Sequence, residues 1–168
     1  LLTMNPTRFN PGDPIALFLT WTTYGTWLPG DQRGWNRRGD HEALGPNPLL
    51  EEINATRMKE PEFTLTSADR ESVASTIRKH CEIRDWKLHA LAVRSNHVHV
   101  VVTAPDYPGN AVRDQLKAWC SRILKGNHPG RKRFWTEGAS CRCINTDDDL
   151  ATAIEYVSEA QDRNGLEG

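Results

Sequence analysis

The sequence lacks the features of a membrane protein and of a secreted, disulfide-stabilised domain. No apolar run approaches the roughly 20 residues that cross a bilayer, and no signal-peptide pattern opens the chain. Four cysteines are scattered, and Cys141 and Cys143 form one C-x-C without a second pair at zinc spacing, which favours reduced thiols. These absences predict a cytoplasmic protein without a membrane partner.

An excess of positive charge is also missing. The formal net charge of the 168 residues is −1, so a nucleic-acid partner would have to be held by local basic patches. With 38% hydrophobic residues, a chain of this length can build one core. We therefore expect a single domain over residues 1–168, with a long inserted loop at about 26–65.

The most informative stretch is residues 96–102, in which β-branched residues predict a buried strand that also carries two imidazoles. Because strand side chains alternate between faces, His97 and His99 share one side, while Val98 and Val100 share the other. The two histidines are then roughly 6–7 Å apart at Cα and can reach one divalent cation. A metal site and a chance His-x-His pattern are both compatible with this stretch alone.

The other periodicities predict an α+β fold. Strands are expected at residues 15–24, 86–93, 96–102 and 140–144, and helices at 66–84, about 110–126, and from 146 onward. The core order βαββαβ is the split-βαβ, ferredoxin-like arrangement, an antiparallel sheet with two helices on one face. The valine face of the histidine strand would meet these helices, and the two imidazoles would lie on the open face.

An additional C-terminal helix is expected to cover part of that open face. Thr146 is a good N-cap, and three acidic residues follow it beside the positive end of the helix dipole. The apolar stripe of Leu150, Ile154 and Val157 needs a surface on which to pack. Packing on the open face would bring Tyr156, on the flank of the stripe, near the histidine pair.

Basic residues and tryptophans gather in loops. Segment 26–65 contains Arg33, Arg37 and Arg38 beside Trp35, a combination that single-stranded nucleic acid favours. Further residues that could neutralise phosphates are Lys117, Arg122, Arg131, Lys132 and Arg133. For the loop and for each of these charges, an ordinary solvated surface is an alternative of equal weight.

Taken together, these residues give the chain a resemblance to the HUH superfamily of single-strand endonucleases. The hallmarks are His97-Val98-His99 on a central strand and Tyr156 on a later helix. Within this superfamily the chain resembles the single-tyrosine insertion-sequence transposases, particularly the REP-associated tyrosine transposase branch. The matching stretches are LTWTTYGTWLPGDQRG, RSNHVHVVV, LKAWCSRIL, FWTEGAS and AIEYV, which extend over most of residues 17–157.

The resemblance implies a metal-dependent DNA transposase associated with the nucleoid. Such an enzyme nicks and rejoins single-stranded or hairpin-flanked DNA through a 5′-phosphotyrosine intermediate. Tyr156 would be the nucleophile, and His97 and His99 would hold Mg²⁺ or Mn²⁺. Relatives in the superfamily act as monomers or as homodimers, and both remain open for this chain.

The chain departs from the family pattern at one position. Relatives carry a polar metal ligand one helical turn after the tyrosine, where this chain has Ala160. Glu159 and Gln161 are the neighbouring candidates, and helical geometry does not choose between them.

Two other functions are compatible with the sequence. One is a non-catalytic, single-stranded nucleic-acid-binding module on the same fold, although such modules carry aromatic residues where this chain has its histidines. The other is an HUH replication initiator or relaxase, which the lack of a helicase region disfavours.

Overall fold

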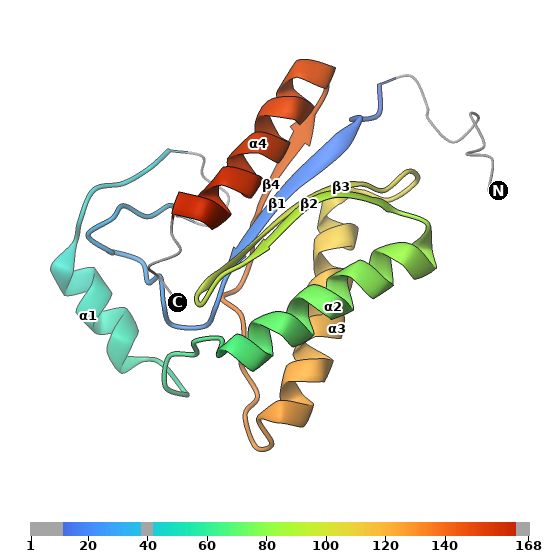
Figure 1. Ribbon diagram of the computed structural model, residues 1–168. Helices are drawn as coiled ribbons and strands as arrows, with labels where there is room; N and C mark the ends of the chain where they lie inside the picture. Colours follow the sequence, from blue (N-terminus) through green and yellow to red (C-terminus); the bar gives the residue numbers. More distant parts are fainter. Residues whose placement is uncertain (1–11, 38–41, 164–168) are drawn as a thin grey trace.

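The structure, a computed structural model, describes residues 12–37 and 42–163, with side chains up to residue 159. Within these residues the centre is a 4-stranded antiparallel sheet in the order β2-β3-β1-β4 (Figure 1). The strands are β1 (Ala16–Thr22), β2 (Lys87–Val93), β3 (His97–Thr103) and β4 (Ser140–Ile144). This is the predicted ferredoxin-like, α+β fold, with β1 and β3 as the central strands.

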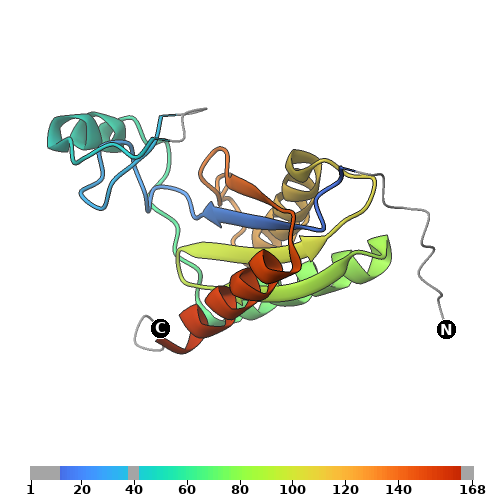
Figure 2. The same cartoon turned by 90° about the horizontal axis from the view of Figure 1, so that it is seen from above.

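Two helices cover one face of the sheet, and one covers the other. Helices α2 (Ser67–Arg84) and α3 (Gly109–Asn127) lie on the first face, while α4 (Asp147–Arg163) crosses the second, as Figures 1 and 2 show. None of the helices in the described ranges is long and apolar enough to cross a membrane.

The alternation of side chains along β3 separates two apolar clusters. Val98 and Val100 are fully buried beneath α2 and α3, where they meet Val73 and Leu116. Val101 points the other way, into a smaller cluster beneath α4. The predicted assignment of Val98 and Val100 to the helix-covered face is therefore confirmed.

The helix termini follow from local hydrogen bonding. A capping box begins α2: the Thr66 hydroxyl accepts from the Asp69 N–H, and the Asp69 carboxylate accepts from the Thr66 N–H. The Thr146 hydroxyl likewise accepts from the Asp149 N–H and caps α4, as predicted.

The segment predicted as a long inserted loop at 26–65 contains a helix that the sequence analysis did not predict. Helix α1 (Pro48–Thr56) begins where the Asn47 side chain accepts from the Leu50 N–H and Pro48 occupies the first turn. None of the helical residues of α1 is buried, and its apolar residues Leu49 and Ile53 remain exposed. Figures 1 and 2 both show α1 standing away from the sheet.

Candidate active site

The two histidines of β3 lie next to each other on the sheet face that α4 crosses. Their ring centroids are 4.8 Å apart, with an interplanar angle of 72°. His97 is half-buried, whereas His99 is only 8% exposed. The predicted juxtaposition of the two rings on one face is therefore present, with His99 deeper than His97.

Each ring is held at its Nδ1 atom by a neighbouring polar side chain. His97 Nδ1 lies 2.7 Å from the Asn96 amide oxygen, which can only accept, so His97 donates from Nδ1. His99 Nδ1 shares a hydrogen bond of 2.8 Å with the hydroxyl of Thr20, its cross-strand neighbour on β1. These bonds orient both rings and direct the Nε2 atoms away from their tethers.

His99 stays neutral well below neutral pH. Burial lowers its pKa to about 4, and the nearby positive charges of His97 and Arg94 act in the same direction. A neutral imidazole is the form that binds a metal ion.

Tyr156 lies beside the histidine pair. Its ring makes edge contacts with His99, at 5.9 Å between centroids, and with Phe18, at 6.1 Å. Phe18 in turn stacks on His99 at 5.6 Å with an interplanar angle of 12°. Tyr156 remains 56% exposed, so its hydroxyl is accessible from solvent.

The packing of α4 explains why Tyr156 is there. Val157 is fully buried against Val101, and Leu150 and Ile154 pack at the edge of the same cluster. The apolar stripe therefore fixes the helix on the open face. Because Tyr156 is next to Val157 in the helix, its ring lies beside His99.

Sequence reasoning missed Arg94, which lies in the turn between β2 and β3. The residue is 9% exposed, and its buried Nε and Nη2 atoms have no hydrogen-bond partner within residues 12–37 and 42–163. Ala92, two residues earlier, is buried on the open face, and strand alternation continued through Arg94 predicts the same face for its guanidinium. This alternation is the feature of the sequence from which the position of Arg94 on the histidine face could have been predicted.

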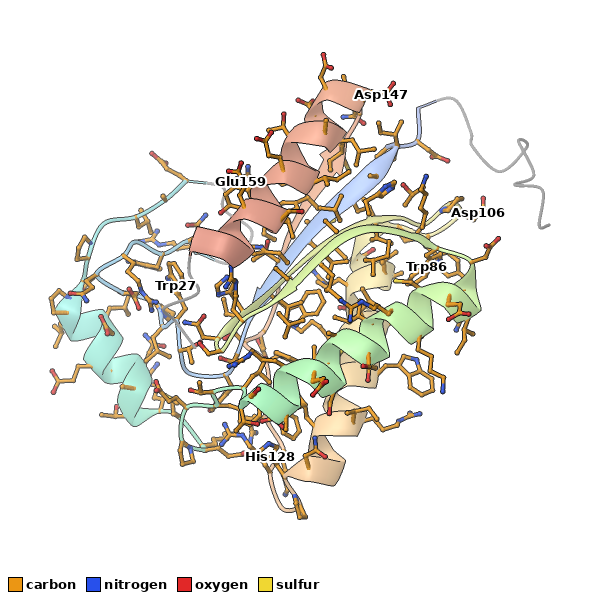
Figure 3. The ribbon with its side chains drawn as sticks, in the orientation of Figure 1. Trp27, Trp86, Asp106, His128, Asp147 and Glu159 are labelled. Carbon is orange, nitrogen blue, oxygen red and sulfur yellow. The ribbon has the colours of Figure 1, made fainter. Side chains whose placement is uncertain are left out.

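The histidine pair supplies two donors for a divalent cation. Within the described ranges, no group of three His, Cys, Asp or Glu side chains is placed to hold a metal ion. Glu159 is exposed on α4 (Figure 3), and the side chain of Gln161 lies outside the description. The donor types and the held rings fit two positions of a metal site, and the third ligand stays a prediction.

Two of the predicted DNA contacts in the 26–65 loop, Arg33 and Trp35, bind other residues of the same loop. Arg33 forms an ion pair with the buried Asp31 at 2.6 Å, donates to the Thr26 carbonyl and lies 4.1 Å above the Trp27 ring. The Trp35 indole donates to the Gly45 carbonyl. Arg37, by contrast, is exposed to solvent. Arg38, the other predicted DNA contact in this loop, lies outside the described residues.

Two further predicted contacts lie on α3, on the face of the sheet opposite the histidines. Lys117 donates to the carbonyls of Thr136 and Gly138, and burial lowers its pKa. Arg122 is exposed and lies 4.5 Å above the Trp119 ring. The fold therefore does not bring these two residues to the histidine pair.

The basic run after α3 is held by one carboxylate. Glu60 accepts from the backbone N–H groups of Lys132 and Arg133 and pairs with the guanidinium groups of Arg131 and Arg133. The side chain of Lys132 is exposed. Together with Lys59, these residues line an open hollow of about 510 Å³.

The chain was compared with known proteins, and one solved structure with a TM-score above 0.5 supports this fold. A search of curated proteins found no match. A solved structure described as the REP-associated tyrosine transposase bound to a REP hairpin is similar over 91% of this chain and 70% of that chain, at 16% identity and a TM-score of 0.55. A candidate transposase from Deinococcus radiodurans is similar over 88% of this chain and 91% of that chain, at 15% identity and a TM-score of 0.47.

The family comparison covers the part of the chain that holds the histidine strand, Arg94 and most of α4. The model of the family described as "Transposase IS200 like" matches residues 55–160, which is more than half of the chain. The chain therefore belongs to the IS200-like transposase family.

Proposed function

We propose that this transposase cleaves and rejoins single-stranded DNA through a covalent bond to Tyr156. The observation that carries the proposal is the packing of the Tyr156 ring against His99, which itself lies against His97. A potential nucleophile and a pair of potential metal ligands thus come together from two elements that are far apart in the sequence.

The proposed reaction begins with attack by the Tyr156 hydroxyl on the phosphorus of the scissile phosphodiester. The new bond joins the phenolic oxygen to phosphorus, the phenol loses its proton, and the bond to the 3′ oxygen breaks. That oxygen leaves as a 3′-OH after taking up a proton, and the 5′ end stays on the protein. Attack by the same or another 3′-OH reverses the step, and the energy of the phosphodiester is retained.

A phenol is a poor nucleophile near neutral pH, so the site has to lower the barrier in another way. When bound to the histidine pair, Mg²⁺ or Mn²⁺ would polarise a non-bridging oxygen of the phosphate. A site of two imidazoles and one oxygen ligand suits Mn²⁺, whereas Mg²⁺ favours oxygen ligands. Glu159 and Gln161 are the proposed sources of that oxygen.

The held rings support this assignment. The Asn96 amide and the Thr20 hydroxyl engage Nδ1 of the two imidazoles, so Nε2 is the atom through which each histidine would bind the metal ion. Phe18, stacked on His99, restricts rotation of the deeper ring. These neighbours limit the reorganisation needed when metal ion and DNA bind.

The proposed substrate is single-stranded DNA next to a hairpin. The similar solved structure of a REP-associated transposase is bound to a REP hairpin, which supports this substrate class. The exposed cations Arg37, Arg122 and Lys132 are proposed to contact phosphates, while Arg33, Lys117, Arg131 and Arg133 would first have to exchange their present partners.

The test is incubation of the protein with end-labelled, hairpin-containing single-stranded DNA and Mn²⁺. We expect a protein–DNA adduct that survives denaturing electrophoresis, together with a free 3′-OH product, and no adduct in EDTA. Tight DNA binding without an adduct would contradict the proposed cleavage. It would favour the alternative function, a non-catalytic module that binds single-stranded DNA. The same DNA without its hairpin tests the substrate class.

A further inference from the structure

The side chain of Arg94 is incompletely satisfied in the folded protein. Nine-tenths of the residue is buried, and neither Nε nor Nη2 finds an acceptor in the part of the chain that the structure describes. Buried guanidinium groups are ordinarily paired with carboxylates or hydrogen-bonded throughout, because an unpaired charge loses its hydration without compensation. Arg33, Arg131 and Arg133 do have carboxylate partners in this protein.

Arg94 is close to the histidine pair. The antiparallel register of β2 and β3 pairs Val93 with Val98, and the Arg94 N–H donates to the His97 carbonyl. The charge of Arg94 also acts on His99. The unpartnered donors thus belong to the end of the sheet that carries His97.

We propose that Arg94 binds the scissile phosphate on which Tyr156 acts. This proposal rests on the proposed function and adds a group that contacts the substrate. A guanidinium offers a planar set of donors that matches the oxygens of a phosphate, and the pairing is strong where water is excluded. A phosphodiester lying against His97 and His99 would supply the acceptors that Nε and Nη2 lack.

The expected contribution of Arg94 is largest in the transition state. Negative charge accumulates on the non-bridging oxygens while the bond to the 3′ oxygen breaks, and preorganised donors lower the barrier at that point. Among the described residues these donors have no partner, so no ion pair has to be broken when DNA binds, although both buried atoms must first be uncovered. This distinguishes Arg94 from the arginines around Glu60.

The decisive experiment compares Arg94→Met, Arg94→Lys and the control Arg84→Met in single-turnover adduct formation with hairpin-containing DNA and Mn²⁺. Arg84 is exposed at the C-terminal end of α2, and its replacement removes the same charge elsewhere. We expect Arg94→Met to slow adduct formation by about 100-fold or more and Arg94→Lys to be intermediate. Arg84→Met should retain the wild-type rate.

Thermal unfolding separates this role from a structural one. Without DNA, Arg94→Met should unfold at the wild-type temperature or above it, since the substitution removes an unpaired buried charge. A variant that unfolds at a lower temperature but forms adduct at the wild-type rate would overturn the proposal. Dependence of the Arg94→Met defect on one particular guanine would also overturn it, in favour of a base contact.

A second measurement does not require cleavage. In a Tyr156→Phe background and in EDTA, the oligonucleotide should raise the melting temperature less when Arg94 is also replaced by Met. Absence of adduct in the wild type would contradict the proposed function, and this measurement would still decide the role of Arg94. An equal DNA-induced shift with and without Arg94, or an unchanged adduct rate, would refute the phosphate contact.

Discussion

Three of the loop arginines are paired with carboxylates, whereas the arginine at the open sheet face, Arg94, is not among the described ion pairs. Arg33 is bound to Asp31, and Arg131 and Arg133 share Glu60, although these residues lie in the most conspicuously basic parts of the sequence. Arg94 is isolated in a short turn and has no such partner among the residues that the structure describes. Clustered charges in a sequence can therefore neutralise themselves in the fold, whereas an inconspicuous arginine can be the one that needs an anion.

The loops and the histidine site also differ in their carboxylates. Burial opposes ionisation of Glu60, but the backbone N–H groups of Lys132 and Arg133 and the neighbouring guanidinium groups together lower its pKa. Glu60 thus remains an anion in a hollow whose other charged lining residues are cations. At the histidines, by contrast, the described residues provide no carboxylate that joins them in a metal-binding group.

The largest expected effect comes from removing a histidine. His97→Ala and His99→Gln should reduce adduct formation by roughly 1000-fold or more, because each removes a proposed metal ligand. Glutamine is preferred at position 99, where the buried ring stacks on Phe18 and alanine would leave a cavity. Anomalous scattering from Mn²⁺-soaked crystals provides the direct measurement, and a well-occupied ion elsewhere, with none between the two rings, would contradict the site.

The buried state of His99 also predicts a pH dependence of stability. Its folded pKa of about 4 lies below the ordinary value of 6.5, so the unfolded chain takes up the proton first as pH falls. The stability is fully present above about pH 6.5 and is lost between there and about pH 4, by an amount on the order of 3 kcal/mol.

Urea unfolding in EDTA over this pH range measures the effect. His99→Gln should flatten the profile. His89→Gln measures a separate contribution, because burial also lowers the pKa of His89, which lies outside the proposed site. An unchanged slope in His99→Gln would show that His99 is not the titrating group.

A smaller effect is expected from the side chain that holds His99. Thr20→Val removes the hydroxyl at Nδ1 and should weaken Mn²⁺ binding by roughly 10- to 100-fold, with little change in fold. Thr22→Val is a matched control on the same strand, since the Thr22 hydroxyl donates to Thr136 rather than to a histidine. Calorimetric titration with Mn²⁺ compares them, and equal affinities would argue against a role for the tether.

The smallest effect concerns the loop charges. Glu60→Gln should release Arg131 and Arg133 and raise the affinity for single-stranded DNA by about two- to fivefold, with a steeper salt dependence. Glu62→Gln removes a neighbouring exposed charge and controls for the change in net charge. If the two variants bind DNA equally at each salt concentration, the Glu60 cluster is only a structural connection between two loops.

The features that follow from the spacing of apolar residues along strands and helices were predictable from the sequence. Alternation along β3 separated the histidines from Val98 and Val100, and the stripe ending at Val157 placed α4 on the open face. Helix α1 was not predicted because its 9 residues are too few to show a sustained period, and none of them is buried in the core. The partners of Arg33 and the lack of a partner for Arg94 are tertiary properties, which no local pattern encodes.

The identity of the tyrosine that carries DNA tests the account most directly. Peptide mapping of the covalent adduct by mass spectrometry should find the nucleotide on Tyr156, and Tyr156→Phe should bind DNA but form no adduct. Tyr107 packs against Trp86 and the helix-covered core, and the Tyr24 hydroxyl accepts from the Lys59 N–H. An adduct on Tyr107 or Tyr24, or wild-type adduct formation by Tyr156→Phe, would contradict the proposed active site.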